Sequence, residues 1–125
     1  MSGLKRWFPA FVIMGIIFAL SSVRGEVINT PPAGNAPTQM IGHFLLFFTL
    51  CLSYYYATGD ILVSVLLTIL YGIFDELHQL NTPLRSASLF DIKTDTLGAL
   101  TSGVFLLLRR KFMLRKKNGT RADIA

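Results

Sequence analysis

The sequence has 125 residues, of which 52% are hydrophobic and only 15% are charged, and its formal net charge is +5. A soluble domain carries about 25% charged residues, and the core of so short a chain is too small to bury this much apolar sequence. The composition therefore argues against a water-soluble domain and against several domains, and it favours a small membrane protein.

Four apolar stretches follow one another along the chain, at residues 7–23, 40–57, 61–80 and 91–108. A helix needs about 20 residues to cross about 30 Å of hydrocarbon. The first, second and fourth stretches nearly reach this length, whereas the third reaches it only if the polar residues after Phe74 are included. We therefore predict an all-α membrane protein, a four-transmembrane-helix bundle formed by residues 1–108. Residues 109–125 form a basic tail, which we expect to be disordered.

The first apolar stretch has a second interpretation. Lys5 and Arg6 precede an apolar run that ends in small residues at 19–22, a pattern typical of a secretory signal peptide. In that case three spans would remain, and the amino end of the bundle would lie on the other side of the membrane.

Basic residues are distributed unevenly among the ends of the predicted spans. With four spans both termini lie on one side, and that side collects nine of the twelve basic residues. Because basic residues near span ends favour the cytoplasmic side, we expect both termini in the cytoplasm. We thus predict a multi-pass protein of the inner (plasma) membrane. The charge of the short tail is explained by this topology, and we expect no nucleic-acid partner.

The third stretch ends in polar residues that a soluble helix would place at its surface. Counting about 1.5 Å per residue from Ile61 places Asp75 only about 21 Å along the span. We therefore expect Asp75, Glu76 and Gln79 to lie within the outer part of the bilayer. A charge at the bilayer centre costs about 2.5–3.5 kcal/mol on insertion scales, so these side chains should face other helices.

Polar residues of two other stretches are expected at the same depth. The fourth stretch carries Asp91 and Asp95 one turn apart on one helical face, and the second carries His43 near its outer end. Arg85 lies in the following loop, which could fold back over the carboxylates. The sequence therefore predicts an outward-facing polar pocket. The candidate catalytic residues are Asp75, Glu76 and Asp95, and the candidate substrate-binding residues are His43, Gln79, Arg85 and Asp91.

One spaced set of residues extends over most of the chain. It comprises Phe18-Ala19-Leu20-Ser21-Ser22, His43-Phe44, Tyr71-Gly72, Asp75-Glu76, Gln79, Pro83, Arg85, Asp91, Asp95 and Gly98. This set resembles the VanZ-like family of small bacterial membrane proteins. Residues 39–42 depart from the family pattern, which often has an acidic residue and a lysine just before the histidine. The family's named member is associated with low-level resistance to teicoplanin, so the resemblance implies a link to glycopeptide resistance without supplying a biochemical activity.

Two hypotheses explain the polar residues. In one, they bind or modify a membrane lipid or a lipid-linked envelope precursor, with Arg85 on a phosphate and the carboxylates as general acid and base. A divalent cation on the four carboxylates is one form of this hypothesis, and a proton-coupled transporter is a further alternative. In the other, the chain is a structural or accessory membrane protein whose polar cluster only holds the helices together. The sequence specifies neither a metal, a cofactor nor an oligomeric state.

Overall fold

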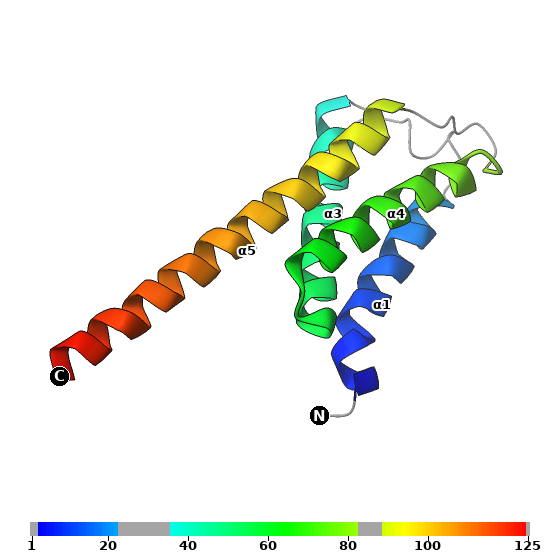
Figure 1. The fold of residues 1–125 in the computed structure, drawn as a ribbon. Helices are drawn as coiled ribbons and strands as arrows, with labels where there is room; N and C mark the ends of the chain where they lie inside the picture. Colours follow the sequence, from blue (N-terminus) through cyan, green and yellow to red (C-terminus); the bar gives the residue numbers. More distant parts are fainter. Residues whose placement is uncertain (1–2, 23–35, 83–88, 125) are drawn as a thin grey trace.

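The structure is a computed structural model that describes residues 3–22, 36–82 and 89–124. The described residues form four helices: α1 (Gly3–Ser21), α3 (Ala36–Thr58), α4 (Ile61–Gln79) and α5 (Leu89–Ile124) (Figure 1). The predicted all-α class is confirmed, and each predicted span overlaps one of these helices.

Three of the described helices are long and apolar enough to cross a membrane. They are α1, residues Thr38–Thr58 of α3, and α4. The chain is therefore a multi-pass membrane protein. In α5, charged residues interrupt the apolar sequence on both sides, with Asp91, Lys93 and Asp95 before it and Arg109 after it. The fourth span thus stays a prediction.

A tight connection joins α3 to α4 and makes them antiparallel neighbours. Gly59 adopts a positive φ of 73°, a conformation that glycine reaches without a Cβ clash, and its N–H donates to Tyr55 O at 2.8 Å. Asp60 then begins α4, because its Oδ1 accepts a hydrogen bond of 2.9 Å from Val63 N. The sequence Thr58-Gly59-Asp60 therefore supplies both the stop signal and the start signal.

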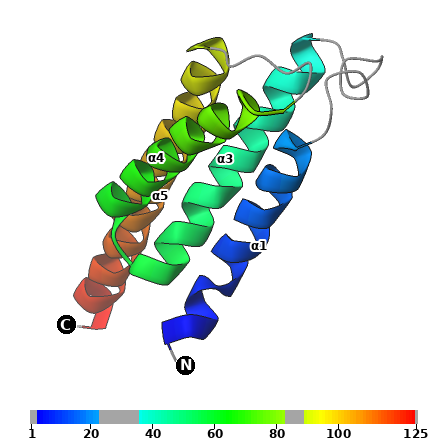
Figure 2. The same ribbon diagram turned by 90° about the vertical axis from the view of Figure 1, so that its right-hand side faces the viewer.

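The helices form one bundle with a distinct polar end. We use this name for the end where α1 and α4 finish and α3 and α5 begin, at the top of Figures 1 and 2. Both chain termini lie at the opposite end in both views. There, Arg6 Nε and Nη2 donate to Tyr56 O at 3.2 and 3.1 Å, which satisfies a carbonyl in the last turn of α3.

A small apolar core fills the space between α1 and α3. Its fully buried members are Ala10, Ile17, Phe47, Leu50 and Tyr54. The Trp7 ring packs edge-on against Tyr54 with ring centroids 6.1 Å apart. Aromatic pairs of this geometry contribute about 0.5–1.5 kcal/mol beyond their buried area, so the core holds α1 on the bundle.

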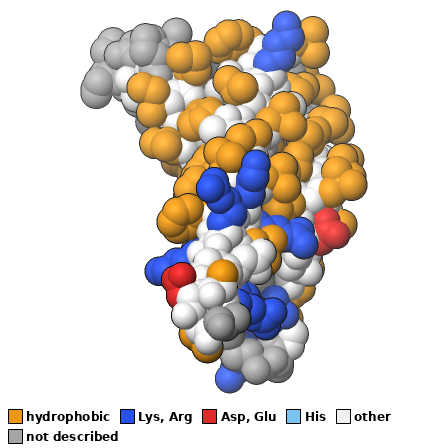
Figure 3. All heavy atoms as spheres, turned by 60° about the vertical axis from the view of Figure 1, so that its left-hand side comes forward, with side chains coloured by type: hydrophobic (Ala, Val, Ile, Leu, Met, Phe, Trp, Pro, Cys, Tyr) orange, Lys and Arg blue, Asp and Glu red, His pale blue; other side chains and the backbone are white. Residues whose placement is uncertain are grey.

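Helix α4 buries polar and small side chains and exposes large apolar ones, the reverse of a soluble helix. Its buried residues are Ser64, Thr68, Gly72, Asp75, Glu76 and Gln79. Leu62, Leu66 and Leu70 are each more than half exposed, and hydrophobic side chains gather over the upper part of the face shown in Figure 3. Small and polar residues at helix contacts with apolar residues outside suit a bundle that lipid surrounds.

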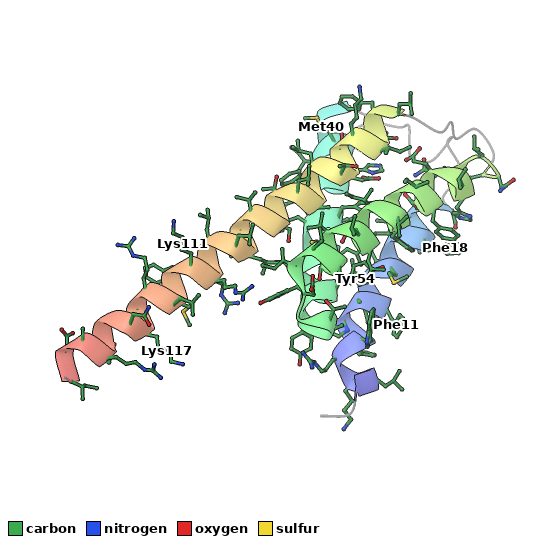
Figure 4. The ribbon with its side chains drawn as sticks, in the orientation of Figure 1. Phe11, Phe18, Met40, Tyr54, Lys111 and Lys117 are labelled. Carbon is green, nitrogen blue, oxygen red and sulfur yellow. The ribbon has the colours of Figure 1, made fainter. Side chains whose placement is uncertain are left out.

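The basic segment after Leu108, for which we expected disorder, is helical through Ile124 in the structure. Lys111 and Lys117 extend from this part of α5, which projects beyond the other helices (Figure 4). Residues 109–117 are arginine, lysine, leucine, methionine and one phenylalanine, and most of these types favour a helix. No proline interrupts the helix, so α5 continues past the bundle.

Candidate functional site

Three carboxylates meet at the polar end of the bundle. Asp75 and Glu76 lie in the last turns of α4, and Asp95 lies in the second turn of α5. Each offers one carboxylate oxygen, and these oxygens all lie within 4.8 Å of one another. The residues are 2%, 2% and 1% exposed, respectively. We call Asp75, Glu76 and Asp95 the carboxylate cluster.

Asp75 is fixed by donors from two helices. Ser21 Oγ, at the end of α1, donates to Asp75 Oδ1. Gln79 Nε2, one turn further along α4, donates to Asp75 Oδ2 at 3.3 Å and to Ser21 Oγ at 3.4 Å. Thr82 Oγ1 donates to Ser21 O at 3.2 Å and so holds the serine in place. The residues on this side of the cluster therefore connect α1 to α4.

Sequence reasoning did not assign Ser21 or Thr82 to the site. A serine at the end of an apolar span carries little signal, because hydroxyls in membrane helices often bond to their own backbone. Ser21 could nevertheless have been predicted as a site residue, since the first predicted span ends on the same side as Asp75. Comparing the depth of all polar residues, and not only of the charged ones, would have included it.

His43 of α3 holds Asp95 in place. His43 Nδ1 lies 2.8 Å from Asp95 Oδ1, and His43 is 19% exposed whereas Asp95 is 1% exposed. Asp95 Oδ2 accepts no hydrogen bond within the described part of the chain. One carboxylate oxygen is thus positioned by α3, while the other is buried without a donor among the described residues.

Two glycines let the helices bring these groups together. A Cβ added at Gly72 would lie 3.3 Å from Asp95 Cβ and 3.3 Å from Phe47 Cε1, so α5 approaches the backbone of α4 here. A Cβ added at Gly98 would lie only 2.7 Å from Phe44 O. Close backbone approach at small residues is typical of membrane helices, and here it sets the depth of Asp95.

The other residues predicted for the site lie around the cluster or outside the described ranges. Asp91 is half-buried one turn before Asp95 and is not among the three carboxylates that converge. Arg85 lies outside the described residues. His78, which is not one of the predicted site residues, lies nearby: its Nε2 is 2.8 Å from Ser22 Oγ, and its ring stacks on Phe18 at 4.3 Å between centroids. Figure 4 labels Phe18 beside the last turns of α4.

The arrangement can accept hydrogen bonds, exchange protons and coordinate a cation. An ionised carboxylate is an acceptor only, with two oxygens, so the cluster offers acceptors to hydroxyl, amine or amide donors. Three buried carboxylates also repel one another unless a proton or a cation is shared among them. His43 is held by Asp95 in the way that a general base is oriented by a second residue.

Comparison with known proteins gives one match. The family described as VanZ/LLP1 matches residues 6–110, a range that contains the whole cluster and most of every helix. No curated protein matches the chain, and no solved structure does.

Proposed function

The chain belongs to the VanZ/LLP1 family, and for this membrane protein we propose a role in binding or modifying a cell-envelope amphiphile at the carboxylate cluster. The ligand is a membrane lipid or a lipid-linked envelope precursor whose polar head group enters at the polar end. The observation that carries the proposal is the convergence of three carboxylates, each at most 2% exposed, from two helices. Ionisable residues inside a membrane are costly, and they mark functional sites.

The chemistry of the cluster favours a head group that presents hydrogen-bond donors. Its charged members are acceptors when ionised, and Gln79 adds an amide to their edge. Sugar hydroxyls and amines meet such acceptors well. For a modification, His43 would act as the general base and Asp95 would orient its ring, because the two are hydrogen-bonded at 2.8 Å.

The proposed membrane arrangement has α5 as the fourth span and both termini in the cytoplasm of the inner (plasma) membrane. Leu97, Leu100 and Val104 of α5 are at least half exposed, as expected for side chains in contact with lipid. Nine of the twelve basic residues belong to the terminal segments, which lie at the end opposite the cluster (Figures 1 and 2). The polar end would then face outward.

A specific observation also supports the structural alternative. The bond between Ser21 and Asp75 joins α1 to α4, and the bond between His43 and Asp95 joins α3 to α5. A polar network of this kind could serve only to fix the helices relative to one another. Removing one charge should then lower stability and function together.

Native mass spectrometry of the detergent-purified protein tests the proposal. The variants are Glu76→Gln, which keeps the size of a side chain in the cluster, and Asp60→Asn as the matched control at the opposite end of α4. We expect the wild type and the control to retain a co-purified amphiphile that the Glu76→Gln protein loses. All three should unfold at similar detergent concentrations, and a parallel loss of stability would favour the structural alternative.

A link to glycopeptide resistance forms part of the same proposal. Cells that express the wild type should tolerate more teicoplanin than cells that express Glu76→Gln at equal protein levels. Equal susceptibility would separate the cluster from any resistance phenotype.

A further inference from the structure

We propose that the carboxylate cluster binds one divalent cation with a preference for oxygen ligands, and we take Ca²⁺ as the ion for the test. The proposal deepens the proposed function, because it assigns a ligand to the same cluster. The oxygen geometry and the bonding of Asp95 support it, and its test contains no amphiphile.

The distances between the oxygens match one shared cation. Two ligand atoms of one ion are separated by at most twice the metal–oxygen distance, which is about 4.6–5.2 Å for Ca²⁺ and about 4.0–4.2 Å for Mg²⁺. The three oxygens of the cluster lie within 4.8 Å of one another. Each pair of oxygens therefore lies within the range that two ligands of one Ca²⁺ ion can span.

The bonding of Asp95 is a second observation that points to a ligand, separate from the oxygen distances. Its Oδ2 is buried and accepts no hydrogen bond from the described residues, although the residue is 1% exposed. Buried polar atoms in native proteins almost always have a partner, which can be an ion. Its Oδ1 is held by His43 Nδ1 at 2.8 Å, and an outer hydrogen bond of this kind orients a ligating carboxylate.

The donor set favours a hard cation over a transition metal. All three offered atoms are carboxylate oxygens, whereas zinc and copper sites draw on histidine nitrogen and cysteine sulfur. His43 is engaged with Asp95 through Nδ1, and Cys51 belongs to a different part of α3. A divalent cation would also neutralise two of the three cluster charges, which would lower the cost of keeping them in the membrane.

Calorimetric titration of the purified protein in detergent with CaCl₂, after treatment with a chelator, tests the proposal. We expect one saturable site per chain in the wild type. Glu76→Gln and Asp95→Asn should each raise the dissociation constant at least about tenfold, the scale of effect seen when a metal site loses one of its supporting groups. Asp123→Asn, which removes an exposed carboxylate from the end of α5, should leave it unchanged. Absence of a saturable site in the wild type, or equal affinity in the cluster variants, would overturn the proposal.

Chemical labelling of the wild-type protein tests the same proposal without variants, and so remains informative if the variants fail to fold. Dicyclohexylcarbodiimide modifies membrane-embedded carboxyl groups, and mass spectrometry locates the modified residues. CaCl₂ should protect Asp75, Glu76 and Asp95 from modification. Equal modification with and without CaCl₂ would show that protons, and not a divalent cation, neutralise the cluster. Neither result depends on an amphiphile, so failure here would leave the proposed function to be tested by lipid retention.

Discussion

Replacing Gly98 with alanine should force α5 away from α3. The added Cβ would lie 2.7 Å from Phe44 O and 3.2 Å from Phe48 N, and both are backbone atoms of α3. Backbone atoms cannot rotate away as the tip of a side chain can, so one helix must move. Overpacking of this kind costs about 1–3 kcal/mol, against a gain of about 1 kcal/mol for replacing glycine inside a helix.

Gly15→Ala is the matched control, because a Cβ at Gly15 of α1 would meet nothing within 4 Å. It receives the same gain in helix propensity, so Gly98→Ala should be less stable than Gly15→Ala by the steric cost alone, about 1–3 kcal/mol. Unfolding in mixed micelles of increasing dodecyl sulfate content, followed by circular dichroism, measures this difference. Equal stability of the two variants would refute the close packing of α5 on α3, and with it the placement of Asp95 beside His43.

Three further predictions concern topology, the histidine and the loop. In a cysteine-free background, a cysteine that replaces Asn35 should react with an impermeant thiol reagent in intact cells, whereas a cysteine that replaces Asn118 should not react. The opposite result would reverse the proposed orientation. His43→Ala should lower the free energy of unfolding by about 1–3 kcal/mol, because the buried Asp95 would lose its histidine partner, and an unchanged value would refute that bond. For Arg85, which lies outside the described residues, we expect amphiphile retention in the order wild type, Arg85→Lys, Arg85→Ala at equal membrane levels, because only arginine offers paired hydrogen bonds to phosphate. Equal retention in all three would remove Arg85 from the site.

The helices could be predicted because lipid sets a minimum length for an apolar span, and the family could be predicted because a spaced set of residues resembles it. Apolar length sets the number of candidate spans, and glycine followed by aspartate marks the turn at Gly59 and Asp60. The polar face of α4 was equally visible, since Gly72 and Gln79 follow the helical period and are buried in the structure. The family expected from these motifs is confirmed over residues 6–110.

The pairing of side chains across helices could be predicted only in part. The depth of His43 and Asp95 indicated that they would meet, and they do, but approximate depth cannot say which of two acidic residues one turn apart lies opposite the histidine. Asp91 and Asp95 share one face of α5, and Asp95 is the buried one because it lies a turn deeper, next to the place where Gly98 brings α5 against the backbone of α3. That contact is with backbone atoms of α3, and the periodicity of the sequence does not predict where these atoms lie.

The length of α5 differed from expectation for another reason. A basic segment at the end of a membrane protein can be disordered or helical with nearly the same composition, and the prediction relied on charge alone. Residues 109–117 contain neither glycine nor proline, and a helix already begun at Leu89 needs no new nucleation to continue. Local propensity therefore outweighed the signal from charge.

The central claim is that the carboxylate cluster receives a ligand from outside the chain. A crystal structure of the wild type grown in a lipidic phase with added CaCl₂ tests it most directly. We predict non-protein density in contact with oxygens of Asp75, Glu76 and Asp95, from a cation, a head group or both. A cluster closed entirely by protein side chains, with Asp95 Oδ2 bonded to a residue of the chain itself, would contradict the claim and leave the network as a structural element.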